Sequence, residues 1–311
     1  MKKRLLRWTI VLTSILTVSL FAGNQAQAIQ VEEAWGAPTF IYGGGLTQDE
    51  INQTKSELGI QNQTIEEFPV TGADIEHYLN LSQVSTSAMI SSVLVERQGQ
   101  GVQVDIITPG NISKVTEDQY ANAAITAGVE NVQIRVASIK PVTGESALTG
   151  VYKAFEVNGE DLEQDRMIVA QEELETTSDI EENLDENQSG RFNQIIINIK
   201  QTINNYYQEN NTTIDSEELR RIIREEIQNA DLSQIITEEQ ISQLVNLFQN
   251  YQKTSAIDSD QVQQQLSELG TTISDAYQEA RDSGWFERAW QAIVDFFTNI
   301  WESFSSSTEG E

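Results

Sequence analysis

The fold is decided within residues 39–58, TFIYGGGLTQDEINQTKSEL. The first four residues of this stretch are β-branched or aromatic and predict a strand. Three glycines follow, and Thr47 and Glu50 then have the spacing of a capping box, which predicts a helix running to about Leu58. A strand, a tight turn and a capped helix in this order are typical of a domain in which helices pack on a sheet.

The alternation of strands and helices continues to about residue 156. Two β-rich runs, 89–98 and 102–108, flank Gly99-Gln100-Gly101 and predict a β-hairpin. A second capping box, at Thr116 and Gln119, predicts a helix that ends at Gly128. Further helices are expected at 71–79 and 147–155, and a further strand at 132–137. These elements predict an N-terminal α/β layer domain with a mixed sheet over residues 29–175.

Strand signals vanish after about residue 162. Residues 176–190 are acidic and poor in apolar side chains, and we interpret them as a linker or an exposed helix end. Helices with narrow apolar stripes need neighbours to be stable in water, so residues 191–283 are expected to form a helical bundle or hairpin array. Its four helical patterns lie at 192–210, 215–228, 237–251 and 260–283. The chain is therefore predicted to be an α+β protein with two domains.

The first 28 residues have the three parts of a secretory signal peptide. Lys2, Lys3 and Arg4 make the start basic, residues 9–22 are mostly apolar, and Ala26-Gln27-Ala28 supplies the small residues of a cleavage site. The apolar run is shorter than the roughly 20 residues of a membrane-spanning helix. We therefore expect export, cleavage near Ala28 and a secreted or cell-envelope-associated protein.

The predicted mature chain is strongly acidic. Cleavage removes four basic residues, so the formal net charge falls from −29 to −33. Such a surface excludes nucleic acid as a partner, because binding phosphates needs clustered Lys and Arg. It also disfavours an anionic membrane surface. The acidity is typical of a solubilising surface, and capture of a cationic partner or of metal ions is the alternative interpretation.

The residue types exclude several kinds of chemistry. The chain has no cysteine, which rules out disulfides, thiolate nucleophiles, zinc–thiolate sites and iron–sulfur clusters. A Ser-His-acid triad would have to use His77, the single histidine. The segment Gly144-Glu145-Ser146 lacks the second glycine of a nucleophile elbow. No cofactor is expected.

Residues 185–196 match part of an EF-hand calcium loop. Asp185, Asn187, Ser189 and Gly190 occupy its first positions, but Ile196 stands where the bidentate glutamate belongs. The coordination shell for a calcium ion is therefore incomplete, and we expect an ordinary linker here and no metal site.

Residues 284–304 predict an amphipathic helix, followed by a disordered tail at 305–311. Seven of the residues from 285 to 304 are aromatic, and Trp285, Trp290, Phe297 and Trp301 are the candidate anchors of an apolar stripe. The stripe either closes the C-terminal bundle or docks a protein partner or a second copy of the chain. Binding to a membrane surface is disfavoured, because the polar face carries three acids and one arginine.

The run from residue 120 to residue 156 resembles a known family. Its pattern is Tyr120-x-x-Ala123-x-x-Thr126-Ala127-Gly128, then Val136-Ala137, then Thr143-Gly144-x-x-Ala147-Leu148-x-Gly150-x-Tyr152-x-Ala154-x-Glu156. This sequence pattern is similar to that of a family of exported Gram-positive proteins known as domain of unknown function 1002. The resemblance covers about residues 31–174 and implies export and a two-part layout. It implies no activity, cofactor or site residue.

Two loops are the candidate ligand site of the N-terminal domain. Gly43, Gly44, Gly45 and Thr47 lie between a strand and a capped helix, where backbone amides can hold an anion, although a plain tight turn is the simpler interpretation. The second loop contains Thr143, Gly144 and Glu145.

The favoured function is non-catalytic binding or assembly through the aromatic helix. The alternative is an envelope hydrolase that uses paired carboxylates of the N-terminal domain, with glycans as the candidate substrate, because this chemistry needs neither Cys nor His.

Overall fold

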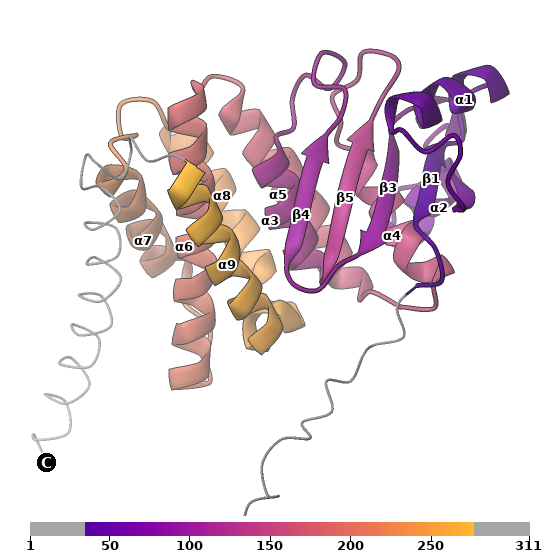
Figure 1. The fold of residues 1–311 in the computed structure, drawn as a ribbon. Helices are drawn as coiled ribbons and strands as arrows, with labels where there is room; N and C mark the ends of the chain where they lie inside the picture. Colours follow the sequence, from indigo (N-terminus) through magenta and orange to yellow (C-terminus); the bar gives the residue numbers. More distant parts are fainter. Residues whose placement is uncertain (1–34, 277–311) are drawn as a thin grey trace, which may run out of the picture. The chain divides into compact units, whose positions relative to one another are not determined.

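One mixed sheet forms the frame of the N-terminal half (Figure 1). The computed structural model describes residues 35–276. The five strands lie in the order β2-β1-β3-β5-β4, and β3 runs against the other four. Their bounds are β1 Thr39–Gly43, β2 Glu66–Val70, β3 Ser92–Arg97, β4 Val102–Ile106 and β5 Val132–Ala137. Pro69 lies in β2, an edge strand, where a missing backbone donor is tolerated.

The strand, turn and capped helix predicted within residues 39–58 are confirmed. Helix α1 spans Gln48–Glu57, directly after β1 and the glycines. Thr47 N–H donates to Glu50 Oε2 at 2.8 Å, and Glu50 N–H donates to Thr47 Oγ1 at 3.4 Å, which completes the capping box. Both boxes that the sequence predicted therefore fix helix starts, since Thr116 and Gln119 cap α3, Glu117–Ala127, in the same way.

The two faces of the sheet carry different helices because side chains alternate along each strand. Phe40 and Leu94 belong to a small apolar cluster with Ile51 of α1. Ile41 and Val93 point to the other face and join the main core, where α4, Ala147–Val157, packs on β1 and β3. The main core then continues without a break into the C-terminal helices.

The predicted hairpin of β3 and β4 is wrong. Strand β5 lies between them, pairing antiparallel with β3 and parallel with β4. The turn at 98–101 crosses the start of β5, where Gln98 N–H donates to Asn131 O at 2.8 Å and Val132 N–H donates to Gly101 O at 3.0 Å. Glycines indicate that the chain reverses, but they do not determine which strand lies alongside.

The α+β class is confirmed, and helices make up the second half of the described chain. Helix α3 is the link between the halves, because Gln119 to Ala127 are all buried and α3 contacts β4 as well as α5, α6 and α9. The remaining helices are α2 Gly72–Leu79, α5 Gln164–Glu181, α6 Glu186–Asn210, α7 Ser216–Asn229, α8 Glu238–Tyr251 and α9 Asp260–Ala276, with short 3-10 turns at Thr86–Ala88 and Ser255–Asp258. In Figure 1, α6 to α9 lie beyond the β4 edge of the sheet.

The acidic stretch 176–190 is largely helical. It comprises the end of α5, a short turn and the beginning of α6, which starts at Glu186 instead of the expected Phe192. Helix α5 runs through the expected domain boundary at residue 175 without interruption. The division into two domains stays a prediction.

Three predicted segments lie outside the described residues: the signal peptide at 1–28, the amphipathic helix at 284–304 and the tail at 305–311. Between residues 35 and 276, none of the helices combines the length and the hydropathy that crossing a bilayer requires.

Candidate functional site

The glycine turn after β1 has its backbone donors occupied. Gly44 N–H donates to Val70 O at 2.8 Å, and Gly45 N–H donates to Met89 O at 2.9 Å. A Cβ atom at Gly43 would lie 2.4 Å from Met89 O, and one at Gly45 would lie 2.6 Å from Ser87 O. These glycines permit the close approach of two backbones, so the turn offers little to an anion.

The loop after β5 has a different role. Gly144 adopts φ +107°, and a Cβ atom there would lie 2.7 Å from Tyr120 Oη. Tyr120 Oη donates to Gly144 O at 2.6 Å, which ties this loop to α3. Residues Ile112 and Val142 form an isolated parallel bridge, so the loops that follow β4 and β5 lie side by side.

A cavity of about 480 Å³ opens beside these two loops. Its walls come from the loops after β4 and β5 and from the turn between α5 and α6. The lining residues are Ser113, Lys114, Thr116, Thr143, Glu181, Glu182, Leu184, Asp185, Glu186 and Ser189. Because β4 and β5 are parallel, the cavity lies beyond their carboxyl ends, where ligands of open α/β sheets commonly bind.

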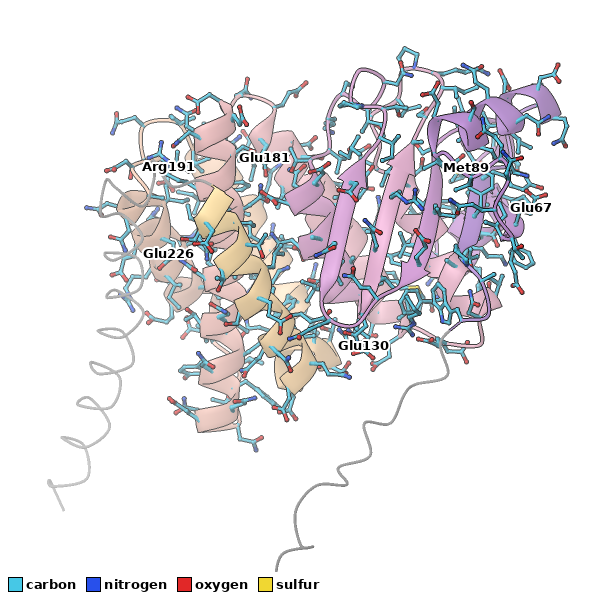
Figure 2. The ribbon with its side chains drawn as sticks, in the orientation of Figure 1. Glu67, Met89, Glu130, Glu181, Arg191 and Glu226 are labelled. Atoms are coloured by element: carbon cyan, nitrogen blue, oxygen red, sulfur yellow. The ribbon has the colours of Figure 1, made fainter. Side chains whose placement is uncertain are left out.

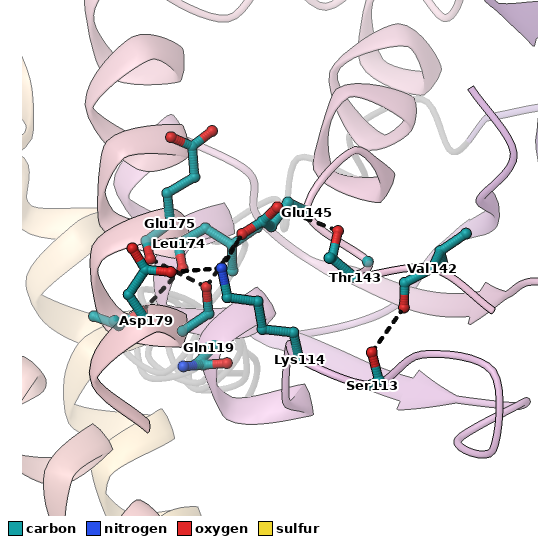
Figure 3. A network of polar contacts seen from close by, with 12 residues as sticks. Ser113, Lys114, Gln119, Val142, Thr143, Glu145, Leu174, Glu175 and Asp179 are labelled. Carbon is teal, nitrogen blue, oxygen red and sulfur yellow. Dashed lines mark hydrogen bonds and ion pairs between the residues drawn. The ribbon is translucent and has the colours of Figure 1, made fainter. Parts of the chain in front are cut away.

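Lys114 is held by two carboxylates at the cavity wall (Figure 3). Its Nζ lies 2.8 Å from Glu145 Oε1 and 2.5 Å from Asp179 Oδ1, and these contacts raise the lysine pKa above its ordinary value. Thr143 Oγ1 lies 3.2 Å from Glu145 Oε2. The positive charge of Lys114 is therefore matched within the protein.

Glu181 is the buried acid of the cavity. Its side chain accepts a hydrogen bond from Ser189 Oγ through Oε2, whereas Oε1 is buried without a hydrogen-bond partner. Burial raises the pKa of Glu181 to about 8, against the lowering effects of Ser189, Asn193 and Gln119, and the charge of Asp118 raises it further. Burial also raises the pKa of Asp118 to about 6. Glu181 is consequently protonated at neutral pH in the absence of a ligand.

Of the two loops that the sequence proposed as one site, only the loop after β5 lines this cavity. Thr143 lines the cavity and Glu145 holds Lys114 beside it, but the lining includes none of the residues from Gly43 to Thr47. Figure 2 places Met89, the neighbour of the glycine turn, on the opposite side of the view from Glu181.

Other sequence candidates have structural roles. Asp185 caps α6, and Asn187, Ser189 and Gly190 lie inside that helix, so the partial calcium loop is not a loop. Within residues 35–276, no group of three or more His, Cys, Asp or Glu side chains is arranged to hold a metal ion. His77 is largely exposed beside Glu156, at 3.7 Å. The anchors Trp285, Trp290, Phe297 and Trp301 lie outside the described residues.

A second hollow of about 480 Å³ follows the flank of α7 and its cap. Its charges are matched by neighbours, because Arg221 pairs with Glu218 and Glu225 at 2.6 Å each, and Arg224 pairs with Glu238 at 2.7 Å. A surface of paired charges along one helix is a weaker candidate than the cavity, whose walls come from three segments.

Sequence reasoning missed most of the cavity. Lys114 and Glu181 carry no motif, and Glu181 lies in a stretch that the sequence analysis interpreted as a linker or an exposed helix end, whereas it is the buried last residue of α5. Its burial depends on α3, which is distant in sequence, and on Ser189 and Asn193 of α6, which lie beyond a chain reversal, so the local pattern contains no signal for it.

Comparison with known proteins assigns the chain to a family. Its relative named "Uncharacterized protein YpuA" from Bacillus subtilis (strain 168) is 28% identical over 260 residues, which cover 83% of this chain and 82% of the relative. No solved structure matches the chain. The model of the family described as "Protein of unknown function (DUF1002)" matches residues 42–269, so it covers most of the secondary structure described above. The chain belongs to this family.

Proposed function

We propose that this protein is exported, loses residues 1–28 and acts as a non-catalytic binding or assembly protein, with residues 284–304 as its docking element. Export rests on the basic, apolar and small-residue parts of the N-terminus. Intact-mass measurement of the secreted protein tests it, with Ile29 as the expected first residue.

The observation that carries the docking role is the packing of the described body. Leu81, which is 50% exposed, is the one large hydrophobic side chain classed as exposed among residues 35–276. An amphipathic stripe closes a bundle only where an apolar surface remains to be covered. The described residues offer little surface of that kind, which favours a partner outside them for Trp285, Trp290, Phe297 and Trp301.

The test compares two variants of the full mature chain. One replaces Trp285, Trp290, Phe297 and Trp301 by Ser, and the matched control replaces Gln291, Asn299 and Glu302 of the predicted polar face by Ser. Sedimentation velocity measures self-association, and co-sedimentation with isolated cell envelopes measures partner binding. We expect association to be lost in the aromatic variant and kept in the control. Association that survives in the aromatic variant contradicts the proposal.

Tryptophan fluorescence gives an independent measurement. Trp35 is the one tryptophan of the described body, where its Nε1 donates to Glu160 Oε1 at 2.6 Å and its ring packs edge-on against Phe155. In a Trp35→Phe background, only tail indoles emit from the mature chain. Red-shifted emission, easily quenched by acrylamide, is expected before association. Blue-shifted, protected emission from a monomer would indicate that the tail belongs to the core.

A second candidate function is hydrolysis of an envelope glycan by paired carboxylates. It is favoured by Glu181, which retains a proton at neutral pH as a general acid must, and which shares its cavity with Glu182 and Glu186. Release of reducing ends from cell-wall glycan measures this activity. Loss in Glu181→Gln but not in Glu217→Gln, an exposed acid of α7, is the expected result, and absence of release by the unchanged protein contradicts the hydrolase.

A further inference from the structure

We propose that the cavity between the α5–α6 turn and the loops after β4 and β5 binds a small organic cation through a primary ammonium group. Glu181 and the carboxylates around it are the recognition residues. This site is separate from the docking role of residues 284–304 and does not depend on it.

The charge of the cavity favours a cation. Four of its lining residues, Glu181, Glu182, Asp185 and Glu186, are acids, and none of them has an ion-pair partner among residues 35–276. Lys114 is the one basic lining residue, and Glu145 and Asp179 already match its charge. The carboxyl end of α5, whose dipole is negative, also points toward this turn.

An unsatisfied buried atom separates this cavity from an ordinary acidic surface. Glu181 is 94% buried, since its exposed fraction is 6%, and it lines the cavity; Ser189, Asn193 and Gln119 face its carboxylate and lower its pKa, but no donor lies within hydrogen-bond distance of its Oε1. Buried polar atoms are nearly always paired in folded proteins. A donor bound in the cavity supplies the missing partner and matches the charge of the ionised carboxylate.

The other lining groups suit an ammonium donor. Thr143 and Ser189 place hydroxyl oxygens in the wall, and an ammonium group has three N–H donors to distribute among a carboxylate and such acceptors. A metal ion fits less well, because the described residues contain no set of three side chains arranged as its ligands. A volume of about 480 Å³ also exceeds what one ion fills and leaves room for a carbon chain.

Binding is expected to release a proton. The free site holds Glu181 protonated, and the bound ammonium favours its ionised form. The charged and polar groups facing Glu181 are Asp118 and Gln119 of α3 and Ser189 and Asn193 of α6. Asp118 has the lower pKa, about 6, so Glu181 is the group that titrates near pH 8. Affinity should therefore rise about tenfold per pH unit between pH 6 and pH 8.

The experiment is calorimetric titration of the full mature protein with 1,4-diaminobutane at pH 7, in two buffers of different ionisation enthalpy. The comparison ligands are butanol, butyrate, guanidinium and calcium ions. We expect saturable binding of the diamine with release of about one proton, and no binding of butanol or butyrate. Absence of diamine binding overturns the proposal. Equal or tighter binding of guanidinium or calcium to the same site overturns the assignment of an ammonium ligand.

Matched variants locate the site. Glu181→Gln keeps the shape of the side chain and is expected to lower affinity at least tenfold and to abolish proton release. Glu186→Gln, at the exposed rim of the cavity, should weaken binding less and leave proton release intact. Glu217→Gln removes the same charge from exposed α7 and should change neither.

Equal losses in the Glu181 and Glu217 variants would show general attraction to an acidic surface and would overturn the site. Circular dichroism and a thermal melt show whether Glu181→Gln is folded. If it is not, the Glu186 variant decides, because a site at this cavity requires its affinity to fall while that of the Glu217 variant does not.

Discussion

Helix α5 buries one glutamate at its middle and another at its end, and the two differ in how completely their carboxylates are hydrogen-bonded. Glu173 is 2% exposed and fully engaged: its carboxylate pairs with Lys200 of α6 and accepts a hydrogen bond from Thr126 Oγ1 at 2.6 Å. Glu181, two turns further on, leaves Oε1 without a partner and faces a cavity. A fully hydrogen-bonded buried carboxylate holds neighbouring helices together. A buried carboxylate that lines a cavity and has an unpaired oxygen can instead accept a hydrogen bond from a ligand bound there.

The largest effect is expected from Lys200→Met. Lys200 is fully buried, and its Nζ also donates to Asn122 O at 3.1 Å, so it joins α3, α5 and α6. Removing it leaves Glu173 as an unpaired buried charge, which typically destabilises a fold by about 3–5 kcal/mol. Urea denaturation measures the loss. The double variant Lys200→Met/Glu173→Gln should recover much of it, and a double variant as unstable as the single one contradicts the ion-pair explanation.

Glu181 should make stability depend on pH. Its folded pKa is raised from 4.5 to about 8, so the folded state retains a proton that the unfolded state releases. The resulting stabilisation is fully present below about pH 4.5 and is lost as the pH rises through about 8, at up to about 1.4 kcal/mol per pH unit. Compared with the unchanged protein, Glu181→Gln should become relatively more stable as the pH rises. Denaturation curves from pH 5 to pH 8.5 measure this difference.

Glu226 is the control for that experiment. It is also buried, and its pKa is raised by burial to about 7, but Asn198 Nδ2 donates to its Oε2 at 2.9 Å and it does not line the cavity. Glu226→Gln should remove a similar pH dependence of stability. That dependence ends about one pH unit lower, because the pKa of Glu226 is about 7 and that of Glu181 is about 8. Only Glu181→Gln should also remove diamine binding. If the difference in stability between Glu181→Gln and the unchanged protein does not vary with pH, Glu181 is not protonated in the folded protein.

The wall of the cavity is sensitive to Gly144. Gly144 and Gly59 both have positive φ, but Gly144 is crowded by Tyr120 and Ile112, whereas a Cβ atom at Gly59 meets nothing within 4 Å. Gly59→Ala should therefore cost only the backbone strain, about 1–2 kcal/mol. Gly144→Ala should cost about 1–3 kcal/mol more, because a methyl group forces Tyr120 or its neighbours to move. Equal melting temperatures for the two variants would contradict this account of the wall.

The middle and the end of α5 also differ in what the sequence could predict of them, as do other parts of the fold. Capping boxes and glycine turns are local, and the structure confirms the boxes at Thr47 and Thr116. The family resemblance, carried by residues 120–156, is also confirmed. The place of β5 between β3 and β4 is set by pairing between distant strands, so turn residues predicted the wrong neighbours. The loop at Thr143 was a candidate from sequence, but the burial of Glu181 arises only when α3 and α6 pack against α5.

The smallest effect is expected from Lys114→Met, which sharpens the contrast with Lys200. Both lysines pair with carboxylates of α5, but Lys114 and Asp179 retain 21% and 59% of their side-chain exposure. Water screens such a pair, so its removal should cost less than about 1 kcal/mol in urea denaturation. The same change makes the cavity more negative and should strengthen diamine binding modestly. A loss as large as that of Lys200→Met would mean that the end of α5 is held together as its middle is, and that the cavity is part of the structural core.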